Sequence, residues 1–238
     1  MALKIPLALD ERVIDHHIPT MPGQTPRVDD DVVTLRDALK AAREEANNIV
    51  ALESAMTNDR TRQTGEAALL VADAAKRSGA RIVERLDAAR ARVVTAIERL
   101  DKLTAAPPMP INNQEIADEV EMRTTLKAMT DKERDDVIND AFISGKTHII
   151  AAILHKDAFM SGLKPARQAA LRHRYQQQFH ASDVVRRARL AKQLEAFDRA
   201  GTAFTRLINE ASDSPAIHLQ AANKRAADEA LAVLMQRT

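Results

Sequence analysis

The run Ser144-Gly145-Lys146-Thr147 comes closest in this sequence to a motif that does chemistry, because it matches the end of a phosphate-binding loop. The complete motif also needs a glycine at position 140, a strand before the loop and a helix after it. Position 140 is aspartate, and the residues before it have a helical pattern. We therefore predict a helix end, a short turn and a new helix start here, without a nucleotide site.

Histidines give a second candidate chemistry, which is metal binding. His16 and His17 are neighbours in a proline-rich segment, where adjacent side chains do not converge on one ion. Metal-binding pairs on a helix usually sit about four residues apart, often with a carboxylate. The remaining spaced pairs are seven residues apart, namely His148 with His155 and His173 with His180. We predict surface or hydrogen-bonded core histidines, no metal site and no cofactor.

Nucleophilic and acid–base catalysis have no recognisable signature in the chain. There is no cysteine, which excludes thiol catalysis, disulfides and cysteine-based zinc sites, and no serine elbow motif is present. The paired acids look like solvated helix faces: Glu44-Glu45, Asp118-Glu119 and Asp135-Asp136. We predict that the protein is not an enzyme.

Charge is distributed unevenly although the net charge is only +1. Residues 158–192 contain eight basic residues and one acid, whereas residues 111–140 contain nine acids and four bases. One interpretation is that the basic helix 164–192 binds nucleic acid through phosphate contacts, although only Tyr175 is nearby for base stacking. The other, which we favour, is that the acidic and basic segments face each other within one chain or between subunits. Some of the arginines would be plain solvated residues.

Both interpretations of the basic segment use the same residues. The candidates for contacts with phosphate or with an acidic partner are Arg167, Arg172, Arg174, Arg186, Arg187 and Arg189.

The elements that must position these residues begin with a segment, 1–29, that contains four of the nine prolines. Leu3, Ile5, Leu7 and Leu9 alternate with other residues, which predicts an extended segment with one apolar face. The segment is either an unstructured tail or an extended arm that docks on a neighbouring subunit.

Residues 30–104 carry two runs of apolar residues at the alternating three- and four-residue spacing of a coiled coil. The second run extends from Ala72 to Leu103, and many of its residues are alanine or glycine. The polar run 57–64 separates the two runs and puts them out of phase, so the helix either folds back as a hairpin or continues with changed winding. We favour the hairpin.

A proline-rich linker, 105–111, ends the long-helix region, and a helical bundle domain is predicted over 112–238. Its helices are expected at about 112–129, 131–143, 147–156, 165–211 and 216–236, with a break near 180–183 in the fourth. Thr130 and Glu133 form a capping-box pattern at the second of these helices. All aromatic residues lie between Phe142 and Phe204, so the compact core should be in this half of the chain.

The fold class that follows is all-α, with an extended N-terminal arm, long heptad-patterned helices as a coiled coil or hairpin, and a helical bundle. A seam that one helix cannot bury alone predicts a non-enzymatic structural or assembly protein that works as a homo-oligomer with other protein subunits. By compositional analogy it would suit a phage virion; the alternative is the nucleic-acid-binding protein. No stretch is long and apolar enough for a membrane span, so we expect a cytoplasmic protein or one packaged in an assembly. The predicted oligomer seam is Ile82, Leu86, Val93, Leu100, Leu103, Leu190, Leu194, Phe197 and Phe204, and the docking arm is Leu3, Ile5, Leu7 and Leu9.

Overall fold

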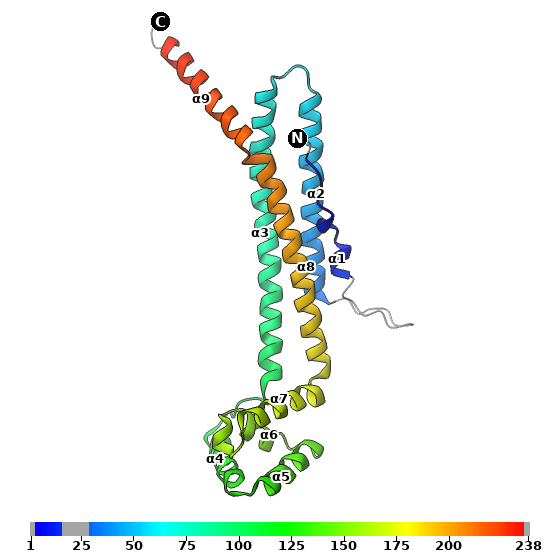
Figure 1. The fold of residues 1–238 in the computed structure, drawn as a ribbon, viewed down its shortest axis with the longest axis vertical. Coiled ribbons are helices and arrows are strands. Elements are labelled where there is room, and N and C mark those ends of the chain that lie inside the picture. The colour runs from blue at the N-terminus through cyan, green and yellow to red at the C-terminus, as the bar shows by residue number, and fades with distance from the viewer. Residues whose placement is uncertain (1–2, 16–28, 236–238) are drawn as a thin grey trace, which may run out of the picture. The chain divides into compact units, whose positions relative to one another are not determined.

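A computed structural model describes residues 3–15 and 29–235, and over these residues the fold is all-α (Figure 1). The chain forms two compact units. Unit 1 comprises Met1–Val94 and Leu190–Thr238, and unit 2 comprises Thr95–Arg189. Two long helices, α3 (Thr64–Ala105) and α8 (Ala181–Ser212), have residues in both units.

Unit 1 is built on a helical hairpin. Helix α2 (Asp30–Asn58) ends where the polar run begins, and α3 starts after five intervening residues, 59–63. The side chain of Asp29 caps α2 by accepting a hydrogen bond from the backbone N–H of Asp31. Asp31 also pairs with Arg92 on α3 at 3.0 Å, and α2 and α3 lie side by side (Figure 1). The hairpin prediction is therefore confirmed, and the continuous helix is excluded.

Helix α8 is the third long helix of unit 1 from Leu190 onward. It contributes the aromatic side chains that the hairpin lacks, since Phe197 and Phe204 are both buried. On the hairpin alanine and glycine lie among buried leucines, and Gly79 allows a close approach of α8: a Cβ there would lie 2.9 Å from three side-chain atoms of Ile208. The small seam residues thus make room for a bulkier third helix.

The inward face of α8 differs in part from the predicted seam. Leu190, Phe197 and Phe204 are buried as the spacing predicts, but Gly201 has no neighbouring atom within 4 Å of its Cβ position. Helix α8 also buries residues one position before the heptad line, namely Gln193, Ala196, Ala200 and Leu207, and it buries Ala211, which continues that line. The reason is that a helix packed against two neighbours buries a stripe wider than a two-helix seam.

The N-terminal segment is not simply extended where the structure describes it. Residues Leu7–Leu9 form a single 3-10 turn, η1, and Arg12–Asp15 form a short helix, α1. Leu9 and Ile14 are fully buried, whereas Leu7 is 94% exposed. The alternating pattern therefore does not produce the predicted extended apolar face, because local backbone hydrogen bonds turn the chain between successive leucines.

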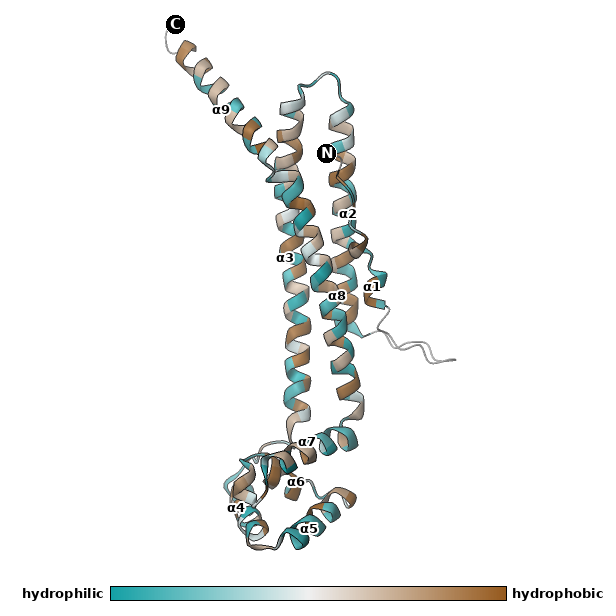
Figure 2. Ribbon diagram, in the orientation of Figure 1, coloured by the Kyte–Doolittle hydropathy of each residue, from teal (hydrophilic) through white to brown (hydrophobic). Residues whose placement is uncertain are grey.

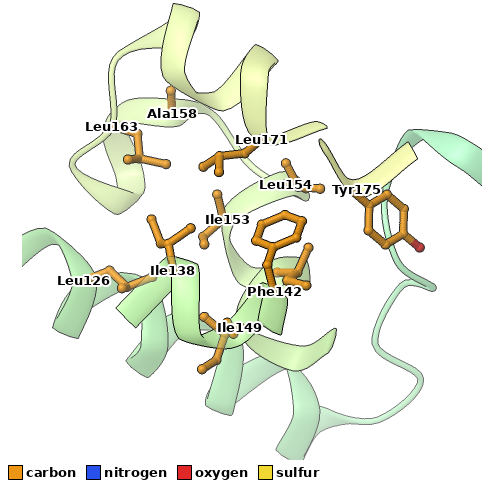
Figure 3. Packing of buried hydrophobic residues seen from close by; sticks show 12 residues of the cluster. Leu126, Ile138, Phe142, Ile149, Ile153, Leu154, Ala158, Leu163, Leu171 and Tyr175 are labelled. Carbon is orange, nitrogen blue, oxygen red and sulfur yellow. The ribbon is translucent and has the colours of Figure 1, made fainter. Parts of the chain in front are cut away.

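Unit 2 consists of shorter helices around a denser apolar core. Its elements are α4 (Asn113–Ala128), α5 (Asp131–Ile143), α6 (Thr147–Leu154), the 3-10 helix η2 (Ala158–Ser161) and α7 (Pro165–Phe179). Phe142, Ile153 and Leu171 point into the common core, with Tyr175 at its margin (Figure 3). Large branched and aromatic side chains bury more area per residue than alanine, so five short elements suffice to enclose this core.

Helix boundaries in unit 2 follow local capping chemistry. The Thr130–Glu133 capping box is present as predicted. Gly162 ends η2 with φ +69°, and a Cβ there would meet the guanidinium of Arg134 at 2.9 Å. Pro165 begins α7, which needs no N–H at that position. The predicted break near 180–183 falls at His180, between α7 and α8.

The grouping of the chain differs from the predicted domain boundaries. Residues 190–238, which were placed in the bundle domain 112–238, group with the hairpin, and residues 95–104 group with the bundle. The last helix is α9 (Pro215–Met235), in unit 1. Among the described residues, no helix is long and apolar enough to cross a membrane.

Candidate functional site

Unit 1 has a partly apolar groove at the tip of the hairpin, which we call the tip groove. Its volume is about 630 Å³, within the range of ligand-binding clefts. The ends of α2 and α3 and the junction of α8 with α9 form its walls. Its apolar lining includes Met56, Ala67, Val71, Ala211 and Ile217.

The tip groove carries negative charge on its margin. Glu53 occupies a position where the α2 spacing calls for an apolar residue, and its carboxylate accepts a hydrogen bond of 2.9 Å from the backbone N–H of Leu3. Glu210 lines the same groove from α8. Asp59 and Arg62 also line it, but they form an ion pair with each other at 3.3 Å. Two carboxylates therefore give the groove its net charge.

Helix α9 is the least covered element of the described chain. None of its residues from Pro215 to Met235 is buried, and all those from Ala222 onward are exposed. Its base is held next to the hairpin tip, because Ile217 lines the tip groove and Gln220 lies against Gly65. Apolar residues continue to its far end, where Leu231 is 53% and Leu234 65% exposed (Figure 2). Contiguous exposed apolar surface is a common property of interaction sites in proteins.

The predicted docking arm contacts the hairpin of its own chain. Leu9 is buried, Leu3 lines the tip groove, and Leu7 and Ile5 are exposed. Ion pairs hold the arm to α2, with Arg43 3.3 Å from Glu11 and Arg36 3.4 Å from Asp15. Gln193 of α8 donates a hydrogen bond to the carbonyl of Ile14.

The predicted seam residues are mostly buried inside the single chain. Leu86, Val93, Leu100, Leu190, Phe197 and Phe204 are buried, Ile82 and Leu194 are half-buried, and Leu103 is 49% exposed. In unit 1 the seams of α3 and α8 are thus filled by the three-helix packing itself. Of the nine predicted seam residues, Leu103 is the one that is exposed enough to contact another subunit.

Several of the candidate basic residues have protein partners within unit 2. Arg167 pairs with Asp135 at 2.8 Å, and Arg187 pairs with Asp101 at 2.9 Å. The pair with Asp101 raises the pKa of Arg187 above its usual value through a side-chain hydrogen bond. The others lie on the same helices: Arg172 donates to the carbonyls of Ala105 and Leu154, Arg174 donates to Asn139 and stacks on Phe142, and Arg186 and Arg189 are half-buried on α8.

A buried polar cluster in unit 2 was not identifiable from the sequence. The His155 side chain is 2% exposed and lies between Glu119, 2.8 Å from Nδ1, and the Pro107 carbonyl, 2.8 Å from Nε2. Arg123 completes it at 3.1 Å from Glu119. The cluster joins α4, the end of α6 and the proline-rich linker. The prediction that Asp118-Glu119 is a solvated helix face is wrong for Glu119, because its side chain is only 12% exposed and faces His155. The i, i+4 spacing of Glu119 and Arg123 is the one local pattern in this cluster.

The remaining candidates for chemistry have structural surroundings. Ser144 ends α5, Gly145 has φ +65°, and Lys146 pairs with Asp140 at 2.7 Å, so the predicted turn between two helices is confirmed. His180 contacts both Asp183 and Tyr175. His16 and His17 lie outside the described residues, and within the described part no group of three or more metal-binding side chains occurs.

In comparisons with known proteins, no family model, no curated protein and no solved structure matches this chain.

Proposed function

We propose that this chain is a non-enzymatic structural protein that works as a homo-oligomer within a larger assembly, of the kind found in phage virions. The observation that carries the proposal is helix α9, whose residues are all unburied although it ends in an apolar run, 230–235. In proteins most of the stability of a helix comes from packing of its apolar face, and the described residues leave every residue of α9 unburied. A protein partner on α9 supplies that cover.

The subunit contact in this proposal moves from the predicted seams to the exposed elements. Leu86 and Val93 are buried in the chain's own bundle, so replacing them with aspartate would test folding and not association. The exposed apolar residues Leu103, Leu219 and Leu231 remain accessible. The arm, residues 3–15, belongs to the same proposal as a docking element that positions the hairpin tip.

Nucleic-acid binding by helix 164–192 is the competing function. The ion pair of Arg167 with Asp135 and that of Arg187 with Asp101 supply both guanidinium groups with protein acceptors. Such exposed pairs contribute only about 0–1 kcal/mol each, and they favour the assembly function by that small amount. Strong salt-dependent DNA binding would favour the competing function.

The test is native mass by size exclusion with light scattering, with refractive index for concentration because the chain has no tryptophan and one tyrosine. We expect a defined multimer whose mass falls on dilution. A DNA titration at two salt concentrations serves as the matched measurement. A monomer at every protein concentration, together with affinity for DNA that falls steeply with salt, would replace the assembly function by the competing one.

A further inference from the structure

The tip groove of unit 1 is an apolar site with an acidic margin. Of helix α9, only the base, Pro215 to Ile217, lines it. Met56 and Val71 contribute apolar surface from α2 and α3, and Glu53 and Glu210 contribute the carboxylates. Because Asp59 and Arg62 neutralise each other, the groove suits an apolar segment that carries a positive charge.

One face of α9 has that chemistry. Lys224, Ala227, Leu231 and Leu234 follow a three-four-three spacing, which places them along the same side of the helix. All four are exposed. They form a ridge about 15 Å long at 1.5 Å per residue, with the cation at one end and the leucines at the other. We call these four residues the α9 ridge.

The α9 ridge does not enter the groove of its own chain. Ile217 and Gln220 fix the base of α9 at the hairpin tip, and the helix runs away from α2 and α3 beyond this point (Figure 1). Every residue from Ala222 to Met235 is exposed. Over the described residues, each chain therefore presents a groove and an exposed ridge of matching chemistry.

We propose that the α9 ridge of a second copy docks in the tip groove, with its leucines against the apolar walls and Lys224 toward Glu53 and Glu210. A twofold axis lets each copy give its ridge to the other's groove, so that both surfaces of both copies are covered and the contact closes at a dimer. The opposite charges select the partner and its direction along the groove. The inference rests on the proposed homo-oligomer and names the surface that makes it.

A charge exchange tests the contact. Glu210→Lys and Lys224→Glu each place like charges together, and each should raise the dimer dissociation constant by on the order of tenfold. The double variant restores opposite charges and should return the constant toward that of the unaltered chain. Lys40→Glu is the matched control, because Lys40 is exposed on α2 and does not line the groove. Helix content by circular dichroism confirms that each variant is folded.

Cysteine cross-linking tests the same contact directly, because the unaltered chain contains no cysteine. Thr57 lines the tip groove and Leu234 ends the α9 ridge, and both are exposed. When Thr57→Cys chains are mixed with Leu234→Cys chains under oxidation, we expect a disulfide between positions 57 and 234 of different chains, identified by mass spectrometry. Ile143→Cys, exposed on α5 of unit 2, replaces Thr57→Cys in the control mixture and should not cross-link efficiently to position 234.

The outcomes separate this inference from the function on which it rests. A multimer with the expected cross-link and a restored double variant supports both. A multimer that neither charge change weakens, and that forms no link between positions 57 and 234, overturns the α9 contact while leaving the homo-oligomer. A monomer at all concentrations overturns both.

Discussion

Units 1 and 2 differ in the length of their helices and in the side chains that fill their cores. Unit 1 uses long helices whose contacts rely on small residues such as Ala75 and Gly79, with Phe197 and Phe204 supplied by one of the three. Unit 2 uses short helices around a core of branched and aromatic residues (Figure 3). Stability in unit 1 therefore depends on a few large side chains and close helix approach. In unit 2 it depends on many local contacts and buried polar groups.

The largest effect that separates the units is expected for Phe204→Ala. This fully buried aromatic residue is among the largest core side chains of unit 1, so its loss should cost unit 1 about 3–5 kcal/mol. Denaturation followed by helix content should shift to lower denaturant. Tyr175, the only tyrosine and a core residue of unit 2, should report an unchanged transition. Equal shifts of both signals would show that the units unfold together, so that their different packing would not give them separate free energies of unfolding.

In unit 2 the corresponding effect is expected for Arg134→Met. This buried guanidinium donates hydrogen bonds to the carbonyls of Leu126, Met129 and Gly162 at 2.7–2.8 Å. Removing it leaves buried acceptors without donors, at a cost of about 3 kcal/mol. The Tyr175 transition measures the loss.

Arg167→Met is the matched control for Arg134→Met. Its ion pair with Asp135 is exposed, so the control should cost about 0–1 kcal/mol. Similar losses in both variants would contradict the view that buried polar contacts distinguish unit 2.

Two glycines in long helices of unit 1 test close approach at smaller magnitude. At Gly79 an added methyl group meets Ile208, and overpacking should cost about 1–3 kcal/mol. At Gly201 there is no atom within 4 Å, so alanine should stabilise the helix by about 0.5–1 kcal/mol. Thermal unfolding of both variants gives opposite signs if the spacing of α3 and α8 is as described. A stabilised Gly79→Ala protein would contradict it.

The smallest effect concerns the cap of α5 in unit 2 and its dependence on pH. Hydrogen bonds from the hydroxyl and backbone N–H of Thr130 lower the pKa of Glu133 from its ordinary value of 4.5. A carboxyl whose folded pKa is lowered contributes stability above its unfolded pKa, and this is lost as the pH falls through the folded pKa. Glu133→Gln should therefore reduce the acid sensitivity of the Tyr175 transition below about pH 4.5.

The control for that prediction is Glu121→Gln, an exposed residue on α4 outside the capping box. It should leave the acid sensitivity unchanged. Glutamine can also serve in a capping box, so Glu133→Gln should lose little stability at neutral pH. An unchanged acid transition in Glu133→Gln would remove the proposed cause.

Much of the secondary structure was predictable because it depends on neighbours in the chain. The polar run 57–64, the capping box at Thr130 and the break near His180 all appear where the sequence places them. The N-terminal segment was the exception, because hydrogen bonds that turn the chain at Leu7–Leu9 have no counterpart in an alternating apolar pattern.

The candidate site was harder to predict than the helices. The exposed apolar end of α9 was visible as composition, but its lack of cover depends on where the base of the helix is anchored. The tip groove combines Leu3, Val71 and Ile217, which are far apart in the sequence, so no local pattern marks it. Likewise, the buried position of His155 follows from the Pro107 carbonyl reaching it across the fold.

The sequence by itself determined the helices, their caps and the all-α class, because hydrophobic period and capping act over three or four residues. Only the tertiary structure decided which helix fills the hairpin. A heptad seam indicates that the helix needs a packing partner, but it does not indicate whether this partner belongs to the same chain or to another. Here α8 packs against α3, with Ile208 of α8 at Gly79 of α3. The need for a second copy, as we infer it, therefore moves to α9, whose residues 222–235 are all exposed in the described part of the chain.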